Sequence, residues 1–147
     1  MPRVVDGDNL LGSWPGRSRS DSERRTLSRE IAALARGRRR RIVVVFDGVA
    51  PPGLQLGPDV LFSGQGRRAD DVILDLLRRE GDPRGWTVVT NDRSLADQCR
   101  YLGAAVEHCD TFRSQLSSVS SAEKPDKPTD IAEWLEIFGS DEDQPER

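Results

Sequence analysis

Three short apolar runs in this chain each lead to an aspartate, and we interpret them as strands of one sheet. They are residues 3–5 before Asp6, residues 42–46 before Asp47, and residues 86–90 before Asn91 and Asp92. Runs of this kind, rich in β-branched residues, are typical of parallel strands that are buried on both faces. Because the carboxyl ends of parallel strands meet at one edge of a sheet, we expect the three aspartates to converge there.

Between these runs, apolar residues recur at the helical spacing of three and four positions. The first helix is expected to begin with Asp21 or Ser22 as its N-cap and to end at Gly37. Strands that alternate with helices predict the α/β class, with a central, mostly parallel sheet flanked by helices. The further predicted elements are helices over residues 69–77 and 94–102 and short strands over residues 60–62 and 104–106.

The composition changes after the predicted domain of residues 1–113. Residues 114–129 are rich in Ser, Lys, Pro and Asp, which predicts a flexible linker. Residues 130–139 are predicted to form a short amphipathic helix with Trp134 on its apolar stripe. A short helix is marginal alone, which favours packing on the same chain; a homodimer or another protein partner is the alternative. The acidic residues 140–147 are expected to be disordered.

The net charge of -3 conceals a basic body and an acidic end. Residues 1–118 contain 19 arginines and no lysine against 16 acidic residues. Guanidinium groups bind phosphate in a bidentate manner, so the runs at residues 38–41 and 67–68 are candidate contacts for a nucleic-acid backbone. A solvated surface is the alternative interpretation, because charge runs commonly have no other role.

The two cysteines, Cys99 and Cys109, form neither a CxxC pair nor a disulfide framework, which is typical of a reducing compartment. No apolar run approaches the roughly 20 residues of a membrane span, and the first run is too short for a signal peptide. We therefore expect a cytoplasmic protein that is neither secreted nor bound to a membrane.

Several aspartates fall at predicted strand ends or where a helix enters the same edge of the sheet. Carboxylate oxygens are the protein ligands that Mg²⁺ prefers, completed by water and substrate phosphate. Such a cluster suits metal-assisted hydrolysis of a phosphodiester, in which the ion activates a water and neutralises developing charge. Without a cation the carboxylates would repel one another, and at least one would retain a proton. The candidate metal ligands are Asp6, Asp47, Asp70, Asp71 and Asp92.

Each aspartate also has a plain structural interpretation, as an N-cap, a first-turn acid or a turn residue. Helical geometry places Asp70 at the edge of the buried stripe and Asp71 on the outer face, which favours Asp70 as the ligand. Asn9 either orients a ligand or caps the following turn, and Asp8 is expected to be solvated. His108 is the only histidine, which disfavours a histidine-based triad or a zinc site.

Four motifs carry a resemblance to a known family. They are Asp6-Gly7-Asp8-Asn9, Val45-Phe46-Asp47-Gly48, Ala69-Asp70-Asp71 and Val89-Thr90-Asn91-Asp92-Arg93, in this order. With these motifs the chain resembles the NYN domain nucleases of the PIN-like superfamily, most nearly the YacP-like subfamily. The resemblance implies a Rossmann-like PIN/NYN three-layer sandwich and an endoribonuclease that depends on Mg²⁺ or Mn²⁺.

The resemblance also implies catalytic acids at Asp6, Asp70 and Asp92, with Asn9 in support. Asp47 matches the strand-end acid of the subfamily. Ser94 stands where many family members carry a further acid, so we expect one metal ion rather than two. Asp8 stands where an aromatic residue is common. The candidate RNA contacts are Arg67, Arg68, Arg93 and Arg41.

Two other functions fit part of the sequence. A phosphatase of the haloacid dehalogenase type would use Asp6 and Asp8 as its acid pair, but that chemistry normally needs a lysine. The only lysines are Lys124 and Lys127, both in the predicted linker. A non-catalytic RNA-binding or interaction module is the other alternative, because a fold can be reused without its original activity.

Overall fold

The computed structural model describes residues 2–53, 57–79 and 82–123. The chain divides into two compact units, Met1–Leu116 and Ser117–Arg147, and the sheet and the site described below belong to the first. The predicted helix with its Trp134 stripe and the predicted acidic tail lie outside the described residues.

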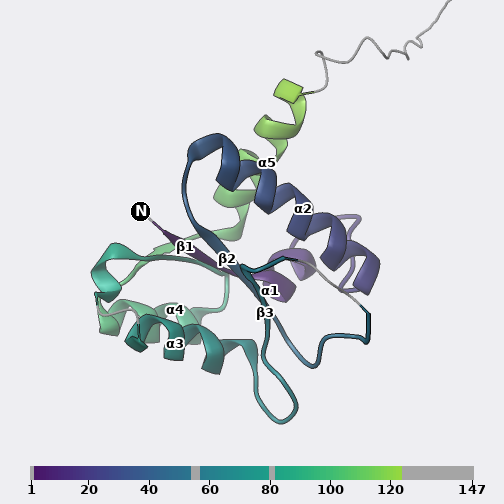
Figure 1. The fold of residues 1–147 in the computed structure, drawn as a ribbon. Helices are drawn as coiled ribbons and strands as arrows, with labels where there is room; N and C mark the ends of the chain where they lie inside the picture. Colours follow the sequence, from purple (N-terminus) through teal and green to yellow (C-terminus); the bar gives the residue numbers. More distant parts are fainter. Residues whose placement is uncertain (1, 54–56, 80–81, 124–147) are drawn as a thin grey trace, which may run out of the picture. The chain divides into compact units, whose positions relative to one another are not determined.

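The first unit is built on a five-stranded sheet in which every pairing is parallel (Figure 1). The order of the strands across the sheet is β3-β2-β1-β4-β5. Central β1 pairs with β2 on one side and β4 on the other, so that Val4 lies opposite both Val43 and Val88. The strands are β1 (Arg3–Asp6), β2 (Ile42–Phe46), β3 (Val60–Phe62), β4 (Thr87–Val89) and β5 (Ala105–Glu107).

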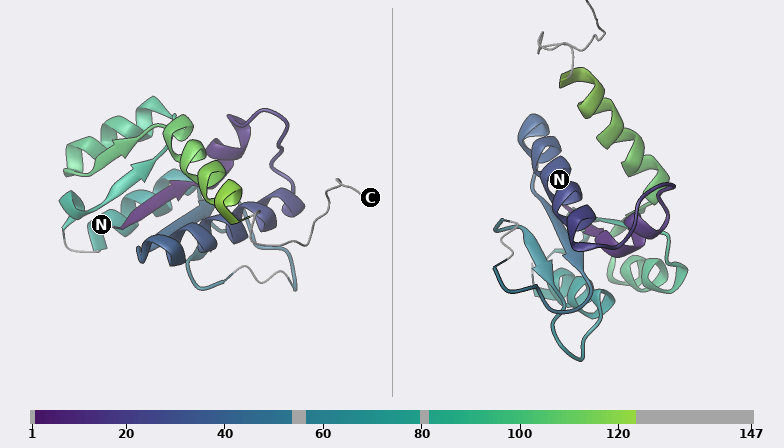
Figure 2. Two further views of the ribbon diagram at one scale, coloured as in Figure 1. Left: turned by 90° about the horizontal axis from the view of Figure 1, so that it is seen from above. Right: turned by 90° about the vertical axis from the view of Figure 1, so that its right-hand side faces the viewer.

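Helices cover both faces of this sheet, which confirms the predicted α/β class (Figure 2). Helices α1 and α2 contact each other and β2 on one face, and α3 and α4 pack together on the opposite face. The helices are α1 (Gly7–Gly12), α2 (Asp21–Arg38), α3 (Ala69–Arg79), α4 (Arg93–Leu102) and α5 (Cys109–Glu123), with a 3₁₀ turn η1 (Pro83–Gly85) before β4.

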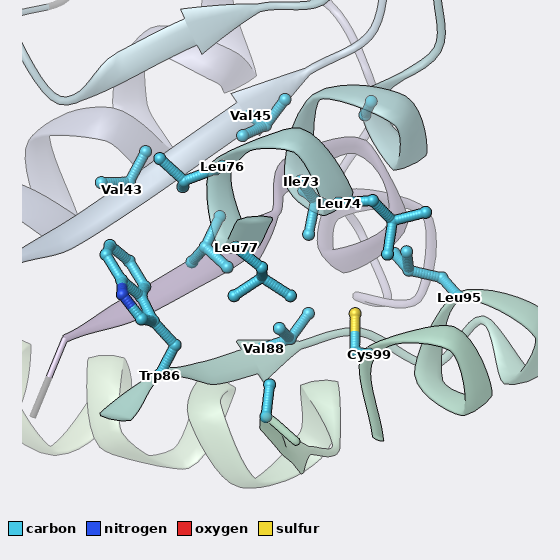
Figure 3. Close-up of a cluster of buried hydrophobic side chains, with 13 residues drawn as sticks. Val43, Val45, Ile73, Leu74, Leu76, Leu77, Trp86, Val88, Leu95 and Cys99 are labelled. Atoms are coloured by element: carbon cyan, nitrogen blue, oxygen red, sulfur yellow. The ribbon is translucent and has the colours of Figure 1, made fainter. Parts of the chain in front are cut away.

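The core between the sheet and the pair α3 and α4 is apolar and closely packed (Figure 3). Val43 and Val88 face the buried side chains of Ile73, Leu77 and Cys99 in this cluster. Alternate residues of a strand point to opposite faces, so the same strands also supply the core beneath α1 and α2. Burial on both faces explains why these strands read as continuous apolar runs.

The beginning and the end of α2 differ from the sequence prediction. Helix α2 has Ser20 as its N-cap, whose Oγ accepts a hydrogen bond from the Glu23 N–H at 3.2 Å. This Ser-x-x-Glu spacing is that of a capping box, which explains why the cap precedes the predicted Asp21. The helix also continues past Gly37 and ends where Arg39 adopts a left-handed conformation with φ 52°.

Helix α1 was not predicted, because six residues are too few to display a helical period. Helix α5 corrects the predicted linker, since it continues from Cys109 through Glu123 and so includes residues 114–123. Its buried Phe112 and Leu116 anchor the early turns, and helix growth from an anchored turn is cooperative. Composition alone therefore misjudged residues 114–123.

β1 is the strand of the sheet at which the chain changes the side on which it adds further strands. The chain adds β2 and β3 on one side of β1, and then crosses to add β4 and β5 on the other side. In open α/β sheets, the crevice beyond the strand ends at such a reversal is the usual place for a ligand. The segments that follow β1 and β4 flank this position.

Candidate active site

The end of β1 and the segment after β4 are joined by the hydroxyl of Thr90. Thr90 Oγ1 donates to Asp6 Oδ2 at 3.1 Å, and the Asp92 N–H donates to the same Thr90 oxygen at 3.1 Å. Asp6 and Thr90 are both buried, with 4% and 2% of their surface exposed. The hydroxyl therefore orients the Asp6 carboxyl and ties the start of the next loop to it.

Burial raises the pKa of Asp6 to about 7, from the 3.8 of an ordinary aspartate. The hydrogen bond from Thr90 lowers this pKa, whereas the charges of Asp70, Asp47 and Asp8 raise it further. These three carboxyls come from three different segments, namely α3, the loop after β2, and α1. Carboxyls that repel in this way favour either a bound cation or a retained proton.

Asp70 lies in the first turn of α3 and is half-buried. Desolvation raises the pKa of Asp70, the Arg68 guanidinium at 3.7 Å lowers it, and the charges of Asp92 and Asp47 raise it. The adjacent Asp71 is exposed, and its Oδ2 accepts a hydrogen bond from the Arg68 N–H at 3.2 Å. Asp70 thus shares the electrostatic environment of Asp6, while Asp71 caps its own helix locally.

Asp47 and Asp92 each hold the start of a helix. Asp47 Oδ1 accepts a hydrogen bond at 2.7 Å from the N–H of Ala69, the first residue of α3. Asp92 is the N-cap of α4, and its Oδ1 accepts from the N–H groups of Ser94 and Leu95. Both carboxylates therefore have a structural role as helix caps, rather than the turn role considered for them from the sequence, and this role coexists with their electrostatic effect on Asp70. We refer to Asp6, Asp47, Asp70 and Asp92 together as the aspartate cluster.

Asn9 holds the loop after β4 through its side-chain amide oxygen. Its Oδ1 accepts a hydrogen bond from the Asn91 N–H at 2.8 Å, and the Cys109 thiol lies 3.5 Å from the same oxygen. Asn91 in turn accepts from the Cys109 N–H at 2.8 Å, at the start of α5. The amide oxygen of Asn9 thus fixes the backbone beside the cluster through a residue far along the chain, a role that differs from the local cap considered for Asn9.

The structure contradicts the expectation that Asp8 is solvated. Asp8 is 4% exposed, and its carboxylate receives two hydrogen bonds from Arg24 of α2, at 2.9 and 3.0 Å. Asp8 Oδ2 also accepts from the Asp47 N–H at 2.8 Å. This ion pair connects α1, α2 and the end of β2, and the sequence carried no signal for it because the partners are 16 residues apart.

Three of the four candidate RNA-binding arginines lie beside the aspartate cluster. Arg68 is 76% exposed next to Asp70, Arg67 is exposed and pairs with Asp75 at 2.6 Å, and Arg93 is exposed directly after Asp92. Arg41 lies elsewhere: it precedes β2, and its carbonyl accepts from the Arg3 N–H at the start of β1. It therefore belongs to the amino edge of the sheet, opposite the cluster.

Neither cysteine is suited to act as a nucleophile. Burial raises the pKa of the Cys99 thiol to about 11, and the charges of Asp70 and Asp6 act in the same direction. Burial likewise raises the pKa of Cys109 to about 11. Because the thiolate is the reactive form, both thiols are unreactive near neutral pH.

The donor chemistry of the aspartate cluster fits a hard divalent cation. The part of the chain that the structure describes contains no set of three or more His, Cys, Asp or Glu side chains already arranged around a metal ion. Two of the four carboxylates are engaged in helix caps. The charges that shift the pKa of Asp6 are nevertheless all negative, an environment that a cation neutralises.

Thr90 orients Asp6, and the sequence analysis gave it no role of its own. A threonine at the end of a strand is ordinary, because β-branched residues favour strands. Thr90 directly precedes two polar residues in Val89-Thr90-Asn91-Asp92, and this position was the one feature of the sequence that could have indicated its role.

Comparisons with known proteins agree with this architecture. A model of the YacP-like NYN domain matches residues 3–134 of the chain. The crystal structure of Rae1 (YacP) from Bacillus subtilis is similar, with a TM-score of 0.74 at 20% identity over 85% of this chain and 78% of that one. Its W164L mutant gives a TM-score of 0.69 at 20% identity over 93% and 89% of the two chains. No curated protein sequence matches.

None of the described helices has the length and apolar character needed to cross a membrane.

Proposed function

The chain belongs to the YacP-like NYN domain family, and from this premise we propose that it is a metal-dependent endoribonuclease. The observation that supports the proposal best is the aspartate cluster at the reversal point of the sheet. Its members come from four separate segments, and burial together with the charges of other members raises the pKa of Asp6 and Asp70. Acids that disfavour their own ionisation at a ligand-binding crevice are typical of a functional site.

In this proposal Asp6, Asp70 and Asp92 hold a Mg²⁺ or Mn²⁺ ion, and Asp47 supports them from the loop after β2. A bound ion of this kind supplies an activated water and neutralises charge on the phosphate that is cleaved. Thr90 keeps the Asp6 carboxyl in place, and Asn9 braces the neighbouring backbone. We propose that the exposed guanidinium groups of Arg67, Arg68 and Arg93 bind the RNA backbone.

The cytoplasmic location stays part of the proposal. Cys99 and Cys109 are both free and buried, which fits a reducing compartment.

The test is cleavage of single-stranded and structured RNA by the full chain, with and without Mn²⁺, for the wild type, Asp6→Asn and Asp70→Asn. We expect each substitution to lower the rate by at least about 100-fold, because each removes a ligand charge that the chemistry uses. Asp82→Asn is the control, since Asp82 is an exposed aspartate that pairs with Arg84 of η1, apart from the cluster and from the proposed RNA contacts.

Equal cleavage by the wild type, Asp6→Asn and Asp70→Asn would exclude this mechanism. RNA binding without cleavage in Mg²⁺ or Mn²⁺ would instead support a non-catalytic RNA-binding module. Hydrolysis of para-nitrophenyl phosphate that Asp8→Asn abolishes would support the phosphatase alternative. The burial of Asp8 in its ion pair with Arg24 opposes that alternative, because the carboxylate is already engaged.

A further inference from the structure

A second feature of the first unit is a cavity of about 360 Å³ beside the carboxyl ends of β4 and β5. Its volume lies within the range of pockets that hold small organic ligands, which begins at roughly 300 Å³. The residues that line it come from the segment after β4, one face of α4, and β5 with the residue after it. They are Thr90, Asn91, Arg93, Ala96, Asp97, Arg100, Val106 and His108.

The cavity shares a wall with the aspartate cluster. Thr90 lines the cavity and also donates the hydrogen bond to Asp6. Asn91 lines it as well and is held by Asn9. A polymer that presents one phosphate to the cluster therefore has a neighbouring residue within reach of this cavity.

The polar lining of the cavity suits an anion. Arg93, Asp97 and Arg100 follow one another at helical spacing on α4, so they share one face of the helix. Arg100 pairs with Asp97 at 3.4 Å, but both side chains are exposed, at 60% and 78%. An exposed pair of this kind contributes little stability, so a phosphate can replace Asp97 as the partner of Arg100.

The other lining groups suit the rest of a nucleotide. His108 is 63% exposed at the side chain and offers a flat ring, while Ala96 and Val106 supply apolar surface. Aromatic rings stack on bases with little preference among them, which is useful for binding a single strand.

We propose that this cavity is a nucleotide subsite, in which Arg100 and Arg93 bind a phosphate of single-stranded RNA that adjoins the cleaved bond and His108 contacts the attached base or ribose. The proposal rests on the proposed function, because it identifies the cavity as part of the path of the RNA. It adds Arg100 and His108 to the residues that bind substrate.

The experiment measures binding of a short fluorescein-labelled single-stranded RNA to the full chain by anisotropy, in EDTA so that binding is separated from metal-dependent cleavage. We expect Arg100→Gln to weaken binding about tenfold, the effect of losing one charge-assisted contact. The slope of log affinity against log salt should fall by roughly one, as for any lost phosphate contact. Arg84→Gln is the matched control, because Arg84 is also exposed and paired with an aspartate but belongs to η1, before β4.

The single histidine provides a second measurement that does not need a substitution. Because His108 is the only histidine in the chain, its ring signals in a proton NMR spectrum are assigned without ambiguity. Adding the same RNA should shift these signals at the concentrations at which anisotropy changes.

The two proposals fail in different ways. If Arg100→Gln binds RNA as the wild type does, or if the His108 signals stay unchanged while RNA binds, the subsite is wrong even where Asp6→Asn abolishes cleavage. If Asp6→Asn cleaves RNA normally, the proposed mechanism is wrong, whereas weaker binding by Arg100→Gln would still support the subsite.

Discussion

At the scale of single residues, the site depends on how each carboxyl is held. Asp6 is buried beside like charges and receives a hydrogen bond from Thr90. Asp92, by contrast, uses one oxygen to cap α4. An aspartate thus serves as a buried, crowded carboxyl at position 6 and as a helix cap at position 92. The neighbouring residues determine which of these two roles it has.

Thr90→Val tests the role of the hydroxyl, because valine keeps the shape of threonine and removes its hydrogen bonds. The buried Asp6 carboxyl loses a donor and the Asp92 N–H loses an acceptor, so we expect unfolding to become easier by about 1–3 kcal/mol. The pKa of Asp6 should also rise further, because the bond from Thr90 lowers it.

Urea denaturation and a carboxyl-carbon NMR titration measure these two effects. Thr87→Val is the control, since it makes the same chemical change within β4, three residues before Thr90. Identical stability and an unshifted Asp6 titration in Thr90→Val would contradict the assigned role.

At the scale of elements, the tight junction between β1 and α1 brings the first motif to the sheet edge. Gly7 begins α1 immediately after Asp6, and a Cβ at Gly7 would overlap the ring of Phe46 and lie 2.9 Å from a methyl group of Val44. The helix can start here only because glycine lets it lie against β2.

Gly7→Ala and Gly37→Ala are a matched pair of substitutions that test whether close packing at Gly7 requires glycine. Gly7→Ala should lower the free energy of unfolding by about 1–3 kcal/mol, the usual effect of overpacking. Gly37 lies within α2, and a Cβ there meets nothing within 4 Å, so Gly37→Ala should raise stability by about 0.5–1 kcal/mol. Thermal unfolding followed by circular dichroism compares both with the wild type, and equal effects of the two substitutions would refute the packing argument.

At the scale of the whole first unit, the parallel sheet gathers several negative side chains at one edge, and the metal-free protein should be sensitive to pH. The pKa of Asp6 is about 7 in the folded protein and 3.8 in a free aspartate. Between these values the folded state holds a proton that the unfolded state has lost, so stability falls as pH rises from about 4 to 7.

The difference between these two pKa values corresponds to roughly 4 kcal/mol as an upper limit. Urea denaturation in EDTA at a series of pH values measures the slope, and Asp6→Asn should flatten it across this window. A metal-free wild type whose stability is constant or rises between pH 4 and 7 would show that Asp6 is not the buried, crowded carboxyl described here.

The sequence alone determined the α/β class, the strand positions and the four motifs, because apolar periodicity and strand-end polar residues are local properties of the chain. It also indicated Asp70 rather than Asp71 as the inward acid, since helical geometry is local. Only the tertiary structure decided that Asp8 pairs with Arg24, that Thr90 supports Asp6, and that Arg41 lies at the opposite edge. Those relationships join residues far apart in the chain, and the strand order β3-β2-β1-β4-β5 that creates them is set by packing, which a local pattern does not encode.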